Sequence, residues 1–279
     1  MSTRKTILIT GTSSGIGAAA VQYFSQQGWN VAATMRTPDK DTQLRALPNV
    51  KLYALDVHDE TSIQQAVADT LRDFGSLEVI VNNAGYGAIG IFEKATADQI
   101  RKQFDTNVFG AMNVIRAVLP HFREQKQGTI INVTSMGGLV TFPIYSVYHG
   151  TKWALEGFSE SLHYELRQFN IKVKCIEPGA IKTDFYTRSQ DFFENPSLTA
   201  YDNYQAITHE NTQKAGATAP GPEVVAKAIF KAANDKSFRL RYPAGNQATW
   251  ILPLRKLLPL SWFINIVRGQ VEKGFKSAY

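Results

Sequence analysis

The chain has very little cysteine and no long uncharged apolar run. Its single cysteine, Cys175, excludes an internal disulfide bond and a metal site built from several cysteines. The longest uncharged stretch near the C-terminus, residues 257–267, is far shorter than the roughly 20 residues of a membrane-spanning helix. The first five residues are polar and the apolar run after them is short, so no secretory signal is expected. We therefore expect a cytoplasmic protein with no metal site and no transmembrane segment.

Clusters of charge of one sign are also missing. The 279 residues include 30 Lys and Arg against 24 Asp and Glu, which gives a formal net charge of +6. The basic residues are scattered as singles and pairs, a pattern typical of a solvated surface rather than of a nucleic-acid stripe. The net positive charge still favours binding of a phosphorylated cofactor. We expect no nucleic-acid partner.

Strand-like apolar segments alternate with helix-length amphipathic segments through the first two thirds of the chain. This alternation is typical of a parallel sheet covered by helices on both faces. The predicted strands are residues 6–9, 30–34, 51–55, 78–81, 128–133, 172–176 and 237–241, and the predicted helices are residues 16–27, 62–74, 97–122, 148–169 and 223–233. The sequence predicts an α/β fold of the Rossmann type, doubly wound, with a seven-stranded parallel sheet in a single dinucleotide-binding domain over residues 1–279.

Two segments depart from the alternation. Residues 184–219 carry clustered aromatic side chains with little helical periodicity, so we expect a long substrate loop there. Residues 243–279 are apolar but are interrupted by prolines and cations. For this tail we expect a lid or a subunit contact, and a helix lying on a membrane surface is the alternative interpretation.

A glycine-rich turn, Thr10-Gly-Thr-Ser-Ser-Gly-Ile-Gly17, follows the first predicted strand and leads into a helix. Glycines let the backbone approach a pyrophosphate, and the start of the helix offers its amides to the anion. The spacing differs from the G-x-G-x-x-G pattern, so a plain tight turn is the alternative. The cofactor contacts predicted here are Gly11, Ser14, Gly15, Ile16 and Gly17.

Arg36 follows the second predicted strand, at the place where an NAD-specific site carries an acidic residue for the ribose hydroxyls. A guanidinium binds a phosphate bidentately, so Arg36 suits a 2′-phosphate. No second basic residue stands among Thr12, Ser13 and Ser14 to assist it. We expect NADP(H) rather than NAD(H), and the alternative is a solvated arginine.

Tyr148 and Lys152 are four residues apart, which places both side chains on one face of a predicted helix. An ammonium group beside a phenol favours the phenolate form. Among the eleven tyrosines only Tyr148 has a lysine four places on, whereas Tyr145 has His149 there. Tyr148 with Lys152 is therefore the candidate proton-transfer pair, and we expect Tyr145 to lie on another face or to precede the helix.

Taken in order, several motifs between about residues 6 and 183 resemble those of the short-chain dehydrogenase/reductase family. They are the glycine turn, Asp56-Val57, Asn82-Asn-Ala-Gly85, Ser135, the Tyr148/Lys152 pair, and Pro178-Gly179 with Ile181 and Thr183. The resemblance implies a catalytic tetrad of Asn107, Ser135, Tyr148 and Lys152. It also implies cofactor contacts from Asp56, Val57, Asn83, Ala84, Gly85, Tyr148, Lys152, Pro178, Gly179, Ile181 and Thr183.

Each of these matches has a structural alternative when it is taken alone. Asp56 can cap a loop and Asn107 can be an amide on a helix surface. Two positions are less typical of the family, since Thr134 precedes the candidate serine and His149 follows the candidate tyrosine. Neither departure removes a reacting group.

The resemblance implies an NADP(H)-dependent oxidoreductase that interconverts a carbonyl compound and an alcohol. Tyr148 would donate the proton, and Ser135 would position the carbonyl oxygen. Lys152 would bind the nicotinamide ribose, and Asn107 would hold a water that connects Lys152 to solvent. The alternatives are an NAD-dependent alcohol dehydrogenase and a non-catalytic NADP(H)-binding regulator or scaffold.

Apolar residues near the predicted site indicate the kind of substrate. Gly137, Phe142, Tyr145 and Phe185 flank the candidate catalytic residues and are the predicted pocket. We expect a lipophilic or aromatic ketone or aldehyde rather than a charged sugar. The sequence also looks similar to the steroid- and retinol-type members of the family, which does not fix the substrate.

Apolar positions on the predicted helices 97–122 and 148–169 favour association between copies of the chain. Examples are Phe109, Met112, Ala154 and Phe158. In the family that the chain resembles, these two helices commonly form a two-fold interface. We expect a homodimer or a homotetramer.

Overall fold

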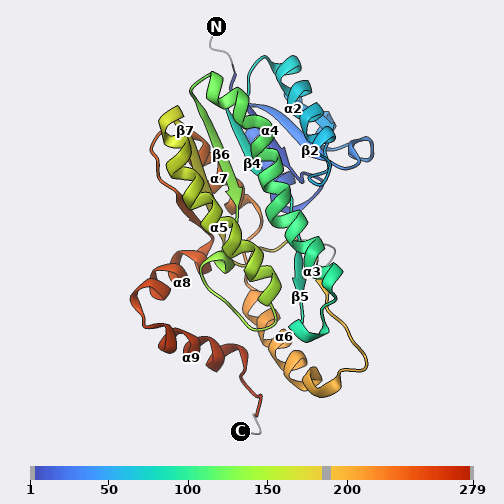
Figure 1. Cartoon of the computed structure of the whole chain (residues 1–279), viewed down its shortest axis with the longest axis vertical. Helices are drawn as coiled ribbons and strands as arrows, with labels where there is room; N and C mark the ends of the chain where they lie inside the picture. Colours follow the sequence, from blue (N-terminus) through green and yellow to red (C-terminus); the bar gives the residue numbers. More distant parts are fainter. Residues whose placement is uncertain (1–3, 184–189, 277–279) are drawn as a thin grey trace.

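A computed structural model describes residues 4–183 and 190–276. Over these residues the centre of the molecule is a seven-stranded parallel sheet with the strand order β3-β2-β1-β4-β6-β7-β9 (Figure 1). Its strands are β1 (Thr6–Thr10), β2 (Asn30–Met35), β3 (Val50–Ala54), β4 (Val79–Asn82), β6 (Gly128–Val133), β7 (Ile171–Pro178) and β9 (Arg241–Ala244). The predicted doubly wound α/β fold is confirmed.

Helices cover both faces of the sheet. On one face α1 (Gly15–Gln26) and α7 (Glu223–Asn234) share a core with alternate strand residues. On the other face α2 (Glu60–Phe74), α4 (Gly110–Glu124) and α5 (Ser146–Leu166) enclose a second core. The two cores arise because successive side chains of a strand point to opposite faces.

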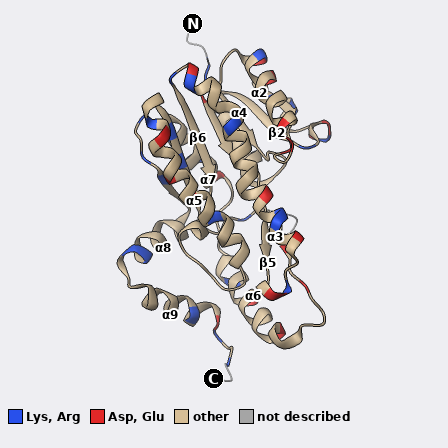
Figure 2. Cartoon of the chain, viewed as in Figure 1, with Lys and Arg blue, Asp and Glu red and all other residues tan. Residues whose placement is uncertain are grey.

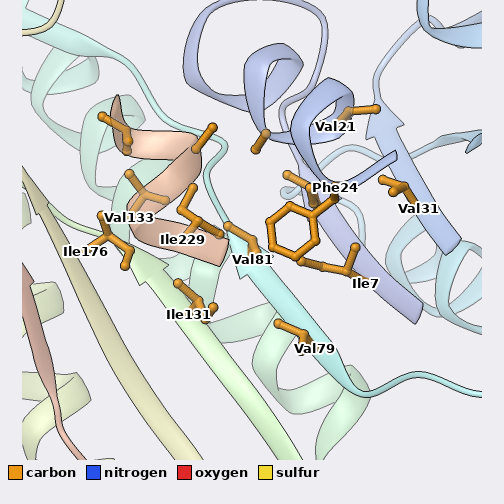
Figure 3. Close-up of a cluster of buried hydrophobic side chains, with 14 of the residues drawn as sticks. Ile7, Val21, Phe24, Val31, Val79, Val81, Ile131, Val133, Ile176 and Ile229 are labelled. Carbon is orange, nitrogen blue, oxygen red and sulfur yellow. The ribbon is translucent and has the colours of Figure 1, made fainter. Parts of the chain in front are cut away.

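The alternation is clearest in β1 and in the core that it shares with α1. Ile7 and Ile9 lie in the α1/α7 core, whereas Leu8 lies in the opposite core, and all three are fully buried. Phe24 of α1 fills the centre of the first core (Figure 3) and meets the Trp29 ring edge-on at 5.2 Å between centroids. Each such buried side chain stabilises the fold by about 1.5–3 kcal/mol, so the sheet is a rigid base for what lies at its edge.

The strand order reverses between β1 and β4. Strands β2 and β3 lie on one side of this pair, and β6, β7 and β9 lie on the other. In open α/β sheets a ligand binds at such a reversal, beyond the carboxyl ends of the strands. The glycine turn follows β1 and Asn83 follows β4, so both lie at this point.

The predicted single helix over residues 97–122 is wrong in its middle. The structure has α3 (Ala97–Phe104), a π-helical turn at Asp105–Phe109, and then α4. The turn brings the Asn107 side chain to the inside of the molecule, where it hydrogen-bonds both backbone groups of Tyr86. A π turn widens the helix locally and is frequently found at functional sites.

Two other predicted boundaries need correction. The seventh strand is β9 (Arg241–Ala244) rather than residues 237–241, because its ladder to β7 begins where Cys175 pairs with Arg241. Pro243 is tolerated in β9 because an edge strand does not need every backbone N–H. Helix α5 begins at Ser146, two residues earlier than predicted, and ends at Leu166 before a 3-10 turn.

The expectation of a long loop over residues 184–219 is also wrong in large part. Within it, β8 (Gln190–Phe192) pairs with the short strand β5 (Gly87–Ile89), and α6 (Asp202–Gly216) is a full helix. Apolar periodicity does not mark α6 because Thr208 is its only fully buried residue. Contacts with the tail stabilise it instead, since the Asn211 amide donates to two backbone carbonyls there at 3.0 and 2.9 Å. The predicted pocket residue Phe185 lies outside the described residues.

The tail forms two helices, α8 (Asn246–Leu257) and α9 (Leu260–Val271), which extend to one side of the sheet (Figure 1). Their inner side chains Ala248, Leu252 and Phe263 form a small core with Val140, in the segment that follows β6. Among the described residues no helix is both long and apolar enough to cross a membrane. The assignment of this tail as a lid or interface stays a prediction.

A buried group of charges joins α5, β7 and β9. The Arg241 Nε lies 3.2 Å from Glu156 Oε2 and 3.3 Å from Glu177 Oε1, and its Nη2 donates to the partly exposed Glu160 at 2.6 Å. Glu177 is 1% exposed. Burial, together with the charge of Glu156, raises the pKa of Glu177 to about 8 in spite of Arg241.

This pKa predicts how stability changes with pH. A carboxyl whose pKa is raised on folding stabilises the fold while it is protonated, and this contribution is lost as the pH rises through about 8. The Glu177→Gln variant cannot ionise there. We expect its free energy of unfolding to rise relative to wild type between about pH 5 and pH 9, by at least about 1.4 kcal/mol, the equivalent of one pKa unit.

Urea unfolding of both proteins at a series of pH values measures this difference. Glu160→Gln removes an exposed carboxylate from the same guanidinium and controls for loss of an ion pair. A difference between Glu177→Gln and wild type that stays constant with pH would contradict the raised pKa.

Candidate active site

The glycine turn is packed tightly against the end of β4. A Cβ at Gly11 would lie 2.8 Å from the Ala84 Cα, and a Cβ at Gly17 would overlap the Gly11 carbonyl oxygen. The Asn83 side-chain amide donates to the carbonyls of Thr10 and Gly11, both at 2.9 Å. Only glycine allows this approach, and the two Asn83 hydrogen bonds hold the turn against the end of β4.

The start of α1 is open to an anion. Its N-cap residue, Ser14, makes no side-chain hydrogen bond to the helix, and the first turn carries no acidic residue. A Cβ placed on Gly15 would face the Thr183 side chain at 3.6 Å, so the segment after β7 lies beside the turn. Backbone amides at a helix start bind phosphate, and these residues fit the pyrophosphate of a dinucleotide.

The end of β2 is tied to the same turn. Both the backbone N–H and the hydroxyl of Thr12 donate to the Thr34 carbonyl, at 3.1 and 3.2 Å. Arg36 follows two residues later and is exposed. At the end of β3, Asp56 accepts a hydrogen bond from the His58 backbone N–H at 3.0 Å and Val57 is buried. The predicted adenosine-side residues therefore lie along one edge of the sheet.

The predicted residues after β7 lie at this edge too. The Gly179 N–H donates to the Ala244 carbonyl at 2.9 Å, and a Cβ at Gly179 would crowd the Ala248 backbone N–H at 3.0 Å. Ile181 is 4% exposed. The backbone of Pro178 and Gly179 is thus fixed between β9 and α8.

Tyr148 and Lys152 lie in the first two turns of α5, as predicted. The Lys152 Nζ is 5.8 Å from the centroid of the Tyr148 ring and donates to the Val133 carbonyl at 3.0 Å. Burial lowers the pKa of Lys152 to about 8, although the negative charge of Glu156 opposes this shift. The ammonium is therefore held beside the phenol and anchored to the last residue of β6.

Ser135 and Asn107 complete the predicted tetrad. Ser135 continues from the end of β6, and its Oγ accepts a hydrogen bond from the Gly137 N–H at 3.0 Å. The Asn107 amide donates to the Thr151 hydroxyl at 3.2 Å, and that hydroxyl donates to the Tyr148 carbonyl at 2.7 Å. The π turn, the end of β6 and the start of α5 therefore carry the four residues, and their catalytic role stays a prediction.

His149 lies among the candidate site residues, and the sequence did not indicate its role. Its buried ring bridges the segment after Ser135, with Nδ1 2.9 Å from the Gly137 carbonyl and Nε2 accepting from the Phe142 N–H at 3.0 Å. Burial lowers the pKa of His149 to about 4, so the ring is neutral and Nδ1 carries the proton. A Cβ at Gly137 would lie 2.6 Å from Nδ1, which explains the glycine there. The only sign of this role in the sequence was that a histidine after the candidate tyrosine is less typical of the family.

An apolar wall lies next to Tyr148. Ile89, Ile144 and Tyr145 are buried, and the rings of Phe142 and Tyr148 pack against them. Tyr145 precedes α5, as expected, and its ring is 6.3 Å from that of Tyr148 between centroids. Beyond Ile144 there is a cavity of about 260 Å³, which Ile89, Phe192 and one side of α6 also line.

Comparison with known proteins shows the family of the chain. Residues 5–192 match the family model described as short chain dehydrogenase. An uncharacterized oxidoreductase of Schizosaccharomyces pombe is 39% identical over 85% of this chain and 99% of its own length. Retinol dehydrogenase 8 of Bos taurus is 33% identical over 91% and 86%. The 3-ketodihydrosphingosine reductase of Bacteroides thetaiotaomicron is 40% identical over 64% and 65%.

Solved structures share the fold over nearly the whole chain. A short-chain dehydrogenase from Streptomyces avermitilis is 34% identical, with a TM-score of 0.80 over 96% of this chain and 99% of that one. ElxO with NADP bound is 26% identical, with a TM-score of 0.72 over 86% and 97%. A 3-ketoacyl-(acyl-carrier-protein) reductase from Brucella melitensis complexed with NADH is 24% identical, with a TM-score of 0.72 over 86% and 96%. The chain belongs to the short-chain dehydrogenase family and is an oxidoreductase that uses a nicotinamide cofactor.

Proposed function

We propose that this oxidoreductase reduces a lipophilic or aromatic ketone or aldehyde to the alcohol, reversibly, with NADP(H). The observation that carries the proposal is the placement of the Tyr148 phenol beside the anchored Lys152 ammonium and next to an apolar wall. An acid, a cation and a water-poor surface are what proton transfer to an apolar carbonyl compound requires.

In the proposed reaction Tyr148 donates its hydroxyl proton to the carbonyl oxygen of the substrate. Ser135 donates a hydrogen bond to the same oxygen and holds it against the phenol. Lys152 stabilises the phenolate that is left, and Asn107 and Thr151 hold the backbone that carries this pair. When it is bound, NADPH supplies the hydride for the carbonyl carbon. In the oxidation direction the Tyr148 phenolate takes the proton back.

The proposed substrate class rests on the wall and on two relatives. Ile89, Ile144 and Tyr145 offer apolar contacts beside Tyr148. The cavity beyond Ile144 adds Phe192 but is also lined by Asp202 and His209. Two relatives are named for lipid-like substrates, a retinol and a 3-ketodihydrosphingosine. Gly137 and Phe142, which the sequence also predicted for the pocket, lie in the segment between Ser135 and α5.

The preference for NADP(H) rests on Arg36. It is exposed just beyond β2, whose end is tied to the glycine turn by Thr12 and Thr34. A 2′-phosphate on the adenosine ribose would lie within reach of a guanidinium in this place. The NADP complex of ElxO supports this choice, and the NADH complex of the Brucella reductase is the reason for testing it directly.

A homodimer or homotetramer through α4 and α5 is part of the proposal. Phe109, at the end of the π turn before α4, is 52% exposed, and Trp153 on α5 is 46% exposed. Exposed aromatic residues on this surface favour an interface between copies.

Replacing Tyr148 by phenylalanine tests the proton donor. We expect turnover of NADPH with carbonyl substrates, followed at 340 nm, to fall about 10²–10⁴-fold because the acid is removed while the ring stays. Binding of NADPH, followed by its fluorescence, should persist. Tyr145→Phe removes a neighbouring phenol and should change turnover less than about tenfold. Full turnover by Tyr148→Phe would refute the mechanism. If wild type binds NADPH tightly but reduces no carbonyl compound, the alternative of a non-catalytic NADP(H)-binding regulator is favoured.

Replacing Arg36 by aspartate tests the cofactor preference. The carboxylate would repel a 2′-phosphate and accept ribose hydroxyls, so kcat/KM for NADPH relative to NADH should fall at least about 100-fold. Arg45→Asp changes another exposed arginine between β2 and β3 and is the matched control. An unchanged preference in Arg36→Asp would show that Arg36 does not select the cofactor.

A further inference from the structure

The two helices of the tail leave a large apolar surface uncovered. On α8, Trp250, Leu254 and Leu257 are 78%, 41% and 82% exposed. Their spacing of four and three residues puts them in one stripe, opposite the buried Ala248 and Leu252. Helix α8 is therefore apolar on two sides, of which the fold covers only one.

Helix α9 continues this surface. Leu260, Trp262, Ile264 and Ile266 are 45–64% exposed and flank a narrow stripe that contains the buried Phe263. Among the described residues, twelve large hydrophobic side chains are exposed, and seven of them lie on α8 and α9. Such a concentration marks an interaction site rather than scattered surface residues. We refer to these seven residues as the tail surface.

The charge around the tail surface is mostly positive, although Glu272, directly after α9, pairs with Arg268 at 3.0 Å. No Asp or Glu occurs in residues 236–271, whereas α8 and α9 carry Arg255, Lys256 and Arg268. Figure 2 shows these helices with blue positions and without red ones. An apolar surface with two exposed tryptophans and a basic fringe complements the interface of an anionic bilayer, where Trp rings lie at the level of the headgroups.

A second copy of the chain is a poorer occupant. A two-fold contact buries the same surface of both copies, so Arg255 and Lys256 would lie in an interface to which neither α8 nor α9 brings a carboxylate. We propose that α8 and α9 dock this protein on the surface of a membrane that contains anionic phospholipids, with the tail surface in the headgroup region.

Docking of this kind has a consequence for the active site. The inner sides of α8 and α9 pack on Val140 and partly on Met136 and Phe142, in the segment between Ser135 and α5. The catalytic segment would thus be held next to the bilayer, from which a membrane-dissolved carbonyl compound can enter. This consequence rests on the proposed function, whereas the docking itself does not.

Co-sedimentation with vesicles tests the docking without any measurement of turnover. The full chain is mixed with vesicles of phosphatidylcholine alone or with about one third phosphatidylglycerol. We expect at least about tenfold tighter binding to the anionic vesicles, weakened by salt because the basic fringe is screened. Binding should also shift the tryptophan emission to shorter wavelength.

Two variants and a control assign the contact. Trp250→Glu with Leu257→Glu should weaken binding at least about tenfold. Lys256→Gln with Arg268→Gln, which leaves the apolar stripe intact, should remove the preference for anionic vesicles. Phe92→Glu, at a site 62% exposed between β5 and α3, should bind as wild type. The urea midpoint of each variant shows whether it is folded.

The proposal is overturned if wild type does not sediment with the anionic vesicles, or if the folded Trp250/Leu257 variant sediments as well as wild type. Equal binding to both kinds of vesicle would overturn the role of the basic fringe. The tail surface is instead an interface between copies if two results are obtained together. Wild type would not bind vesicles, and analytical ultracentrifugation would show an oligomer for wild type but not for the Trp250/Leu257 variant. A failed carbonyl assay with normal vesicle binding would count against the proposed function alone.

Discussion

A short chain of buried hydrogen bonds fixes the helix that carries Tyr148 and Lys152. The Asn82 amide on β4 donates to Asn132 Oδ1 on β6 at 2.8 Å, and the Asn132 amide donates to the Ser159 hydroxyl on α5 at 2.8 Å. Loss of one partner would leave buried polar groups unpaired at a cost of about 1–3 kcal/mol each. Ser159 lies seven residues after Lys152, on the same side of α5. These hydrogen bonds therefore set both the rotation of α5 and its position along the sheet.

The same helix is tied to the sheet again at the reacting end. The Lys152 Nζ bonds the Val133 carbonyl, and Asn107 reaches Thr151 from the π turn. His149 connects the helix to the segment after Ser135 through two backbone groups. The groups proposed to react must stay within fractions of an ångström, and these hydrogen bonds hold the backbone that carries them. The side chains of the apolar wall and of α6, where we propose that the substrate binds, take no part in these hydrogen bonds.

The sequence was sufficient to predict the sheet and the helix that carries Tyr148 and Lys152, because the signals for both are local. Apolar runs separated by helical periodicity predicted the sheet, and the Tyr148/Lys152 spacing placed both groups on one helix face. Helix α6 was missed because Thr208 is its only fully buried residue, so no apolar stripe marks it. The π turn at Asn107 was missed because the sequence from 97 to 122 keeps its helical periodicity, and the bonds of Asn107 to the backbone of Tyr86 join segments far apart in the chain. Contacts between segments far apart in the chain leave no periodic pattern.

The protonation of Lys152 depends on a residue of β9, the last strand of the sheet. Burial favours the neutral amine, and Glu156 one turn along α5 opposes this by favouring the ammonium. Glu156 is itself 2% exposed, and its partner Arg241 comes from β9, the edge strand. A register slip of β9 would remove that guanidinium, raise the cost of ionising Glu156 and so weaken the ammonium next to Tyr148. The protonation state of the site therefore depends on the packing of the last strand, just before the helices of the tail.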